Sequence, residues 1–367
     1  MKTLRYILLL ISFLVILSCS KDNTETINSI INPDPIGLYF PPINSNEWEG
    51  VTAAQLNWNE TNIQDLLDYL ETKDTKGFIV LENGRIVIEE YFNGHSQNDV
   101  LFWNSAAKSL TAAIVGITQD EALLNINDKT SNYLGDSWSS LSQEKEDLIT
   151  VAHHLSMSTG LDEKLDQPLV WTCTNPNCLD YSADAGTRWA YHQGAFSLLF
   201  DIVEDATAMD FEDYANLKLA DKIGMEGAWK KQLYLHRFES DTRSMARFGL
   251  LMMNKGTWNE ESILSESYFN EMTNTSQDLN KSYGYLWWLN GKDNYMGTSS
   301  QEVVLGSLIP NAPDDLYSAL GANDQKIYVV PSRNLVIIRM GDSANEAQLG
   351  PSSFDNELWG KINAVIN

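Results

Sequence analysis

The sequence predicts an α+β fold, an α/β sandwich in which an antiparallel sheet from both chain ends is flanked by helices. Two observations predict it. Runs rich in β-branched and aromatic residues, separated by turn residues, occur at residues 76–94 and again at 315–341. Between them, over about residues 101–300, the hydrophobic pattern is mainly helical. We therefore expect strands from the two ends to share one sheet, with a large, mainly helical insertion between them.

The individual segments at both ends agree with this arrangement. Apolar residues at helical spacing predict an amphipathic helix that begins at Asn62. Asn83-Gly84 then joins two β-rich runs, which is the strongest short-range signal for a hairpin. Residues 78–81 are apolar on both faces, so we expect helices to cover at least one side of this hairpin. Three further strand-like runs and a final helix complete the chain, at residues 315–321, 325–331, 334–341 and 352–367.

The N-terminus is typical of an exported protein. Residues 1–18 have a basic start and an apolar stretch that is short for a membrane span. Ser18-Cys19 ends a segment that resembles the lipobox of bacterial lipoproteins, which implies cleavage before Cys19 and lipidation of its thiol; an ordinary signal peptide is the alternative. Ser20 is not the aspartate that retains lipoproteins in the inner membrane, which implies the outer membrane. Residues 19–45 predict a flexible tether, and 46–367 a globular domain.

Composition narrows the range of partners. With 50 acidic and 25 basic residues the formal net charge is −25, which excludes nucleic acid, so the predicted membrane contact is the lipid anchor alone. In an exported protein Cys173 and Cys178 are candidates for a disulfide, with free thiols as the alternative. The sequence contains no H-E-x-x-H motif, so His153 and His154 are interpreted as helix residues and no metal site is predicted.

The most informative stretch is residues 102–124. Apolar residues at helical spacing predict a buried helix whose N-cap is Asn104 or Ser105. Ser105 and Lys108 lie one turn apart on its first turn, so their side chains share a face. The positive end of the helix dipole and burial both disfavour a charged amine there. A neutral lysine is the general base that a nucleophilic serine needs. The pattern S-x-x-K also occurs at Ser18 and Ser142, where neither opens an apolar helix.

A tyrosine forms the second candidate element. A turn at Gly186 leads to Tyr191, which precedes a helical pattern of buried type. A phenol close to a lysine can pass protons between a nucleophile and a leaving group. Taken alone, a tyrosine next to a tryptophan is more often a core or surface residue than a catalytic one.

Together these motifs resemble the serine β-lactamase and penicillin-binding-protein superfamily. Ser105-x-x-Lys108, Tyr191-His192-Gln193 and the strand Ala319-Leu320-Gly321 occur in its motif order, and the resemblance spans about residues 60–366. It is strongest for the branch of class C β-lactamase-like esterases and 6-aminohexanoate-dimer hydrolases. The resemblance implies a β-lactamase/transpeptidase-like fold, Ser105 as acylated nucleophile, Lys108 as its activator and Tyr191 as proton relay or phenolate base. Which of the two takes the serine proton stays open. The implied oxyanion hole is formed by the backbone N–H groups of Ser105 and Ala322, without a cofactor.

Weaker substrate contacts are implied for the residues next to these motifs: His192, Gln193, Leu320 and Gly321. Two departures from the family pattern affect the prediction. Gln193 stands where Asn is usual, which keeps the amide on a longer arm. Ala319 replaces the cation that holds the substrate carboxylate of β-lactams, which favours uncharged or amine-bearing esters and amides unless Lys326 or Arg339 faces the cleft and compensates.

The sequence thus predicts an exported, lipid-anchored serine hydrolase that acts on small ester or linear amide substrates. The alternatives are a β-lactamase or D-Ala-D-Ala carboxypeptidase and, from another class, a catalytically inactive surface-binding relative. Neither the natural substrate nor the oligomeric state follows from the sequence.

Overall fold

The computed structural model describes residues 37–167, 170–345 and 349–367. The predicted signal, Cys19 and the first part of the tether lie outside these residues. Within them, no helix is both long and apolar enough to cross a bilayer.

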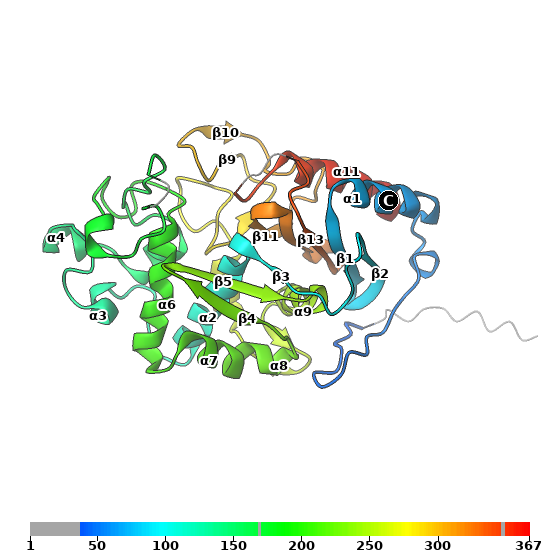
Figure 1. The fold of residues 1–367 in the computed structure, drawn as a ribbon, viewed down its shortest axis with the longest axis horizontal. Coiled ribbons are helices and arrows are strands. Elements are labelled where there is room, and N and C mark those ends of the chain that lie inside the picture. Colours follow the sequence, from blue (N-terminus) through cyan, green and yellow to red (C-terminus); the bar gives the residue numbers. More distant parts are fainter. Residues whose placement is uncertain (1–36, 168–169, 346–348) are drawn as a thin grey trace, which may run out of the picture. The chain divides into compact units, whose positions relative to one another are not determined.

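The described domain contains a six-stranded antiparallel sheet with strand order β2-β1-β13-β12-β11-β8. Figure 1 labels β2, β1, β13 and β11 of this sheet. Its strands are β1 (Thr75–Glu82), β2 (Arg85–Tyr91), β8 (Trp288–Leu289), β11 (Tyr317–Gly321), β12 (Gln325–Val330) and β13 (Leu335–Gly341). Asn83 and Gly84, both with positive φ (49° and 77°), form the turn of the β1–β2 hairpin, as a two-residue I′ turn requires. Because β1 pairs with β13, strands from the two chain ends share one sheet, which confirms the predicted fold class.

Helices cover both faces of this sheet. On one face α1 (Ile63–Thr72) contacts α11 (Ser353–Ile366), and the ring of Trp359 in α11 lies 5.8 Å from that of Tyr328 in β12. On the other face α9 (Thr242–Met253) packs so closely that a Cβ on Gly249 would lie 2.6 Å from Val336 Cγ1. Residues 78–81 are accordingly buried on both sides, as predicted.

The insertion contains the helices that carry the candidate site, α2 (Ala107–Asp120) and α6 (Gln193–Thr207), which pack against each other. Its shorter helices are α3 (Ser131–Leu134), α4 (Gln143–Glu146), α5 (Val151–Leu155), α7 (Phe211–Ala215), α8 (Asp221–Ile223) and α10 (Glu266–Met272). Single turns are η1 (Ala54–Leu56), η2 (Glu60–Asn62), η3 (Asn104–Ala106), η4 (Pro176–Cys178), η5 (Asn216–Ala220, a π turn), η6 (Ala322–Asp324) and η7 (Pro331–Arg333).

The insertion also holds strands that the sequence did not predict. A three-stranded sheet has the order β3-β5-β4, formed by β3 (Leu101–Phe102), β4 (Ala228–Gln232) and β5 (Leu235–Ser240). Two small hairpins are formed by β6 (Thr257–Trp258) with β7 (Glu261–Ser262), and β9 (Asn294–Met296) with β10 (Val303–Leu305). The sequences of β4 and β5, AWKKQ and LHRFES, show little apolar alternation. Hydrophobic periodicity therefore did not indicate strands in this part of the insertion.

The last part of the predicted tether packs on the domain instead. Tyr39 N donates to Asn83 O at 3.0 Å, and the Phe40 ring lies 5.1 Å from that of Trp258. Leu38 also packs against the main hydrophobic core. Apolar side chains before Pro41 thus hold residues 38–40 against the domain, so the packed chain begins before residue 46.

Candidate active site

The nucleophile candidate lies on a tight turn at the start of α2. Ser105 belongs to η3, and α2 begins at Ala107 with Ala106 at its N-cap, so neither Asn104 nor Ser105 caps the helix as predicted. A short 3₁₀ turn over residues 104–106 comes first, so the N-cap of the α-helix lies one or two residues later than predicted. Asn104 has a left-handed φ of 50°, a conformation that Asn tolerates better than most residues. The Ser105 side chain is partly exposed, as a nucleophile must be.

Lys108 lies against Ser105 inside the protein. Its Nζ is 3.3 Å from Ser105 Oγ and donates to Gln193 Oε1 at 2.7 Å. The side chain is only 3% exposed, and it packs over the Phe196 ring at 4.3 Å. Burial lowers the pKa of Lys108 from 10.5 to about 7, because a charged amine loses its hydration there. At neutral pH a large fraction of this lysine is therefore the free amine.

Tyr191 comes from the loop before α6 and meets the same pair. Lys108 Nζ lies 5.1 Å from the centre of its ring, and the ring is 3% exposed. Burial raises the pKa of Tyr191 above 10, while a hydrogen bond with the Ser105 hydroxyl acts in the opposite direction. The tyrosine is therefore a neutral phenol near pH 7. The structure thus brings Ser105, Lys108 and Tyr191 together, although Tyr191 lies 83 positions after Lys108 in the sequence.

The two residues after Tyr191 differ in their placement. Gln193 opens α6, and its longer arm brings the amide oxygen to Lys108. His192 is the N-cap of α6, where its Nδ1 accepts from Ala195 N at 3.1 Å. Its ring is buried, which lowers its pKa to about 4, and it does not belong to the described cleft lining. His192 thus caps α6, and its substrate contact stays a prediction.

The end of β11 contacts the nucleophile turn from the other side. A Cβ on Gly321 would overlap Trp103 O and lie 2.9 Å from Ala106 N, so only glycine permits this approach. Asn104 Nδ2 donates to Ala322 O at 2.8 Å. Ser105 belongs to η3 and Ala322 directly follows β11, and both residues line the same cleft. The two residues expected to form the oxyanion hole thus come from adjoining segments. Leu320, by contrast, is a core residue that is 1% exposed.

A cleft of about 120 Å³ opens onto this group. Its described lining is Asn104, Ser105, Ala107, Lys108, Trp171, Gln193, Phe196, Leu235, His236, Arg237, Ala322 and Leu349. The sequence did not point to His236 or Arg237, since these side chains reach the cleft only through tertiary folding. Cys173 and Cys178 form a disulfide with Cα atoms 5.9 Å apart. Next to it, Trp171 O accepts from Gly194 N at 3.2 Å, which ties this loop to α6.

The compensating cations that the sequence suggested are occupied elsewhere. Lys326 is fully buried and pairs with Asp355 at 3.0 Å under α11. Arg339 is also fully buried and donates to Thr75 Oγ1 and to backbone carbonyls. Neither lines the described cleft, so neither can replace the cation missing at Ala319.

Other candidate groups have structural roles. Lys145, from the S-x-x-K pattern at Ser142, forms a surface ion pair with Asp184 at 2.6 Å. His153 caps α5, and the buried His154 bonds to Thr130 Oγ1 at 2.9 Å. Among the described residues, no group of three His, Cys, Asp or Glu side chains is arranged to hold a metal ion.

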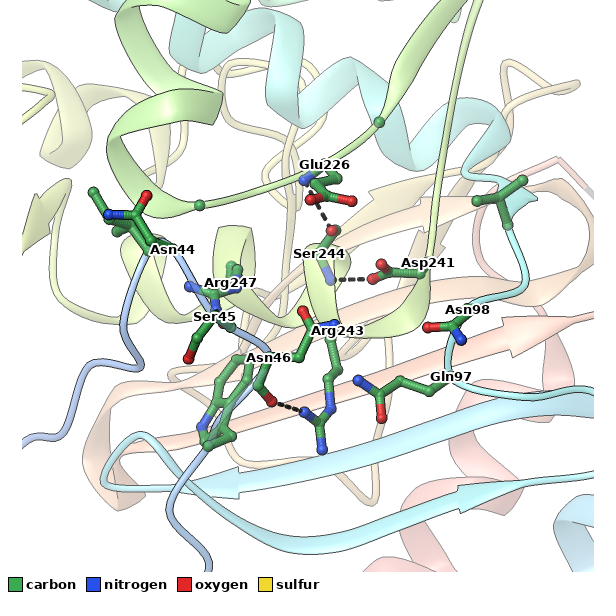
Figure 2. Close-up of a pocket in the computed structure, with 15 residues that line it drawn as sticks. Asn44, Ser45, Asn46, Gln97, Asn98, Glu226, Asp241, Arg243, Ser244 and Arg247 are labelled. Carbon is green, nitrogen blue, oxygen red and sulfur yellow. Dashed lines mark hydrogen bonds between the residues drawn. The ribbon is translucent and has the colours of Figure 1, made fainter.

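A larger hollow, of about 670 Å³, lies at the start of α9 and is lined by amide and charged side chains (Figure 2). Its two arginines are already engaged. Arg243 pairs with Glu89 at 2.7 Å, and Arg247 donates to the carbonyl of Ile223 at 2.8 Å. None of Ser105, Lys108 and Tyr191 lines it. The smaller cleft, which holds a nucleophile and a base, is therefore the candidate active site.

Comparison with known proteins agrees with this geometry. The family model described as Beta-lactamase matches residues 69–357. The structure is similar to a putative 6-aminohexanoate-dimer hydrolase from Bacillus anthracis, with a TM-score of 0.66 and 18% identity over 89% of this chain and 88% of that one. It is also similar to a putative beta-lactamase from Bacteroides dorei (TM-score 0.65, 15% identity, 84% and 99% covered). A family VIII carboxylesterase gives a TM-score of 0.61 at 14% identity, with 87% and 100% covered. No curated protein sequence matches.

Proposed function

Because the chain belongs to the beta-lactamase family of serine hydrolases, we propose that it is an exported enzyme that cleaves ester or small linear amide bonds through an acyl-enzyme on Ser105. The observation that carries this proposal is the contact of a buried Lys108, whose pKa is lowered to about 7, with the Ser105 hydroxyl. A serine is a weak nucleophile until a base takes its proton.

The first step is attack on the substrate carbonyl. Ser105 Oγ forms a bond to the carbonyl carbon while its proton passes to Lys108 Nζ, 3.3 Å away. Gln193 Oε1 accepts a hydrogen bond from the same amine and so orients it. The negative charge that develops on the carbonyl oxygen is stabilised by the N–H groups of Ser105 and Ala322. Lys108 suits the role of base better than Tyr191, since burial lowers the pKa of the lysine and raises that of the tyrosine.

Tyr191 acts in the second half of acylation. When the bond between the carbonyl carbon and the leaving group breaks, the leaving oxygen or nitrogen takes the phenol proton. Lys108 then passes its proton to the tyrosinate, which becomes a neutral phenol again. Water next attacks the acyl carbon, and the same groups pass its protons in the reverse direction, which releases the acid and restores Ser105.

Export as an outer-membrane lipoprotein is part of the proposal. It is supported by the signal-like residues 1–18 and by the segment that resembles a lipobox at Cys19. The disulfide between Cys173 and Cys178 fits an oxidising compartment. Radioactive palmitate labelling of the full-length protein, absent in Cys19→Ala, tests this part separately from catalysis.

A fluorophosphonate probe tests the nucleophile. We expect it to label the wild type and not Ser105→Ala, whereas Ser142→Ala, which alters the exposed S-x-x-K pattern, is labelled like the wild type. Hydrolysis of p-nitrophenyl butyrate follows the same pattern. Equal labelling of the wild type and Ser105→Ala would remove Ser105 from the mechanism. Ser105-dependent turnover of any ester excludes an inactive surface-binding relative.

The absence of a cation at Ala319 makes a β-lactamase or D-Ala-D-Ala carboxypeptidase the second candidate. The missing cation predicts that nitrocefin is hydrolysed much more slowly than p-nitrophenyl butyrate. Comparable rates for the two substrates would favour the β-lactamase assignment over the esterase.

A further inference from the structure

Arg237 is a cation in the cleft that no motif of the family resemblance includes. It lies on β5, opposite Lys230 of β4. Its guanidinium carbon is 3.7 Å from the centre of the Phe102 ring, and its Nη2 donates to Asn104 Oδ1 at 3.1 Å. Asn104 directly precedes the nucleophile. The guanidinium is therefore held at one wall of the cleft, close to the reacting hydroxyl.

Among the residues that the structure describes, no acidic side chain is paired with this guanidinium. Although the chain has 50 acidic residues, no Asp or Glu is among the described lining residues of the cleft. Within the described ranges Arg237 forms no ion pair, in contrast to Arg188, Arg243 and most surface lysines. Burial lowers the pKa of His236 to about 4, so this neighbour is neutral. Arg237 is thus the one permanently charged side chain of the described lining.

The hydrogen bond to Asn104 uses one N–H group of the Arg237 guanidinium and leaves the others available for a ligand. Arginine has five N–H donors in a planar fork that matches a carboxylate, and Asn104 takes one of them. Phe102 supports one face of the fork and so limits its rotation. A planar cation that is supported on one face, and that forms no ion pair with a described residue, is suited to bind an anionic group at the wall of a reaction cleft.

We propose that Arg237 binds a carboxylate on the substrate, so that the enzyme prefers esters or amides that carry a negative charge on the acyl part or on the leaving group. This inference rests on the proposed function. It replaces the preference for uncharged or amine-bearing substrates that the loss of a cation at Ala319 suggested, but it does not restore the cation on β11 that holds the carboxylate of β-lactams, so nitrocefin stays a poor substrate. The cation is present, but it comes from the β3-β5-β4 sheet instead of the β11 strand.

Matched substrates test the proposal. The acyl arm compares mono-p-nitrophenyl glutarate with p-nitrophenyl pentanoate, and the leaving-group arm compares 4-carboxyphenyl butyrate with 4-carbamoylphenyl butyrate. We expect Arg237→Gln to lower kcat/KM for the anionic member of one arm by about 10- to 100-fold, as for loss of a charged hydrogen bond. The neutral members keep kcat/KM within about threefold of the wild type, a factor that corresponds to less than 1 kcal/mol. The arm that responds identifies the side of the scissile bond.

Two variants separate charge from position. Lys230→Gln removes the same charge on the opposite strand, where the lysine is exposed and bound to Glu239, and should leave both arms unchanged. Arg237→Lys keeps the charge without the fork and should retain part of the preference. If Arg237→Gln lowers kcat/KM equally for anionic and neutral esters, Arg237 only positions Asn104 and the proposal is wrong.

A binding measurement distinguishes this failure from that of the proposed function. Calorimetry with monomethyl glutarate uses Ser105→Ala, which needs no turnover. We expect binding to weaken about tenfold in Ser105→Ala/Arg237→Gln, in line with loss of one charged hydrogen bond. Equal binding by the two proteins overturns the carboxylate site. A lack of Ser105-dependent hydrolysis with intact Arg237-dependent binding overturns the hydrolase instead.

Discussion

Replacing Lys108 by methionine should make the protein more stable at pH 7 while it abolishes activity. Methionine has a similar length and no charge, so it fits an apolar site. In the wild type, the buried amine is in contact with Ser105, Gln193 and the Phe196 ring. Holding a lysine there costs stability, because the unfolded chain can keep it protonated in water. The site thus trades stability for function.

The magnitude follows from the pKa. A shift from 10.5 to about 7 corresponds to about 4–5 kcal/mol of destabilisation at low pH. Methionine removes this cost, but it also removes the amine's hydrogen bond and leaves the Gln193 carbonyl oxygen unpaired, which costs about 1–3 kcal/mol. We therefore expect Lys108→Met to raise the free energy of unfolding by about 2 kcal/mol at pH 7.

The pH dependence gives the sharper test. Between pH 7 and 10.5 the unfolded state binds a proton at Lys108 that the native state does not bind, so the stability of the wild type rises with pH. Lys108→Met has no titrating group at this position, so its stability does not rise with pH for this reason. Its advantage over the wild type should therefore shrink by about 2 kcal/mol between pH 7 and pH 9. Tyr191 stays neutral over this range because its pKa is raised, and His236 is neutral because its pKa is lowered to about 4.

Urea unfolding of both proteins, followed by tryptophan fluorescence at pH 6.5, 7, 8 and 9, measures this difference, with Lys145→Met as the control. Lys145 is an exposed lysine in an ion pair, so its variant should gain no stability at pH 7. A difference between wild type and Lys108→Met that is independent of pH would refute the reasoning, because Lys108 would then titrate alike in both states.

Three further predictions concern catalysis. The kcat/KM for p-nitrophenyl butyrate should rise with pH and level off above about 7, where Lys108 is neutral; a profile that falls over this range contradicts a lysine base. Tyr191→Phe should lower kcat about 100-fold for an anilide and less for a p-nitrophenyl ester, whose leaving group needs little protonation; equal losses for both substrates would speak against a proton donor. Gly321→Ala should lower kcat, because its Cβ would overlap Trp103 O beside the nucleophile turn, whereas Gly297→Ala, whose Cβ meets nothing within 4 Å, serves as control. Similar kinetics for the two glycine variants would mean that the turn tolerates the displacement.

Local patterns predicted the parts of the site that depend on local structure. The three-residue spacing of Ser105 and Lys108 puts their side chains on one face whether Ser105 lies in the helix or, as found, in the 3₁₀ turn before it. The Asn83-Gly84 hairpin and the two flanking helices were predictable for the same reason, since turn chemistry and helical period act over few residues.

The faces of the central strands were not predictable. Lys326, Ile327 and Tyr328 are all buried, because helices cover both sides of the sheet. In such a strand apolar alternation no longer distinguishes one face from the other. The sequence therefore could not show that Lys326 points toward Asp355 under α11 and away from the cleft. Arg237 was missed for a related reason, since its place in the cleft depends on the pairing of β5 with β3, and β3 is only two residues long.

A lysine of lowered pKa is unexpected in a protein of net charge −25, because negative charges favour the protonated amine. The field of distant carboxylates raises the pKa of Lys108, but salt screens it within about 10 Å. Burial acts at contact distance and is the cause that lowers this pKa. The same distance dependence permits a carboxylate at Arg237, since no described Asp or Glu lines the cleft. Placing an acid there, as in Leu235→Glu, should raise the pKa of Lys108 and weaken anion binding together, which a shift of the pH profile and the glutarate assay would detect.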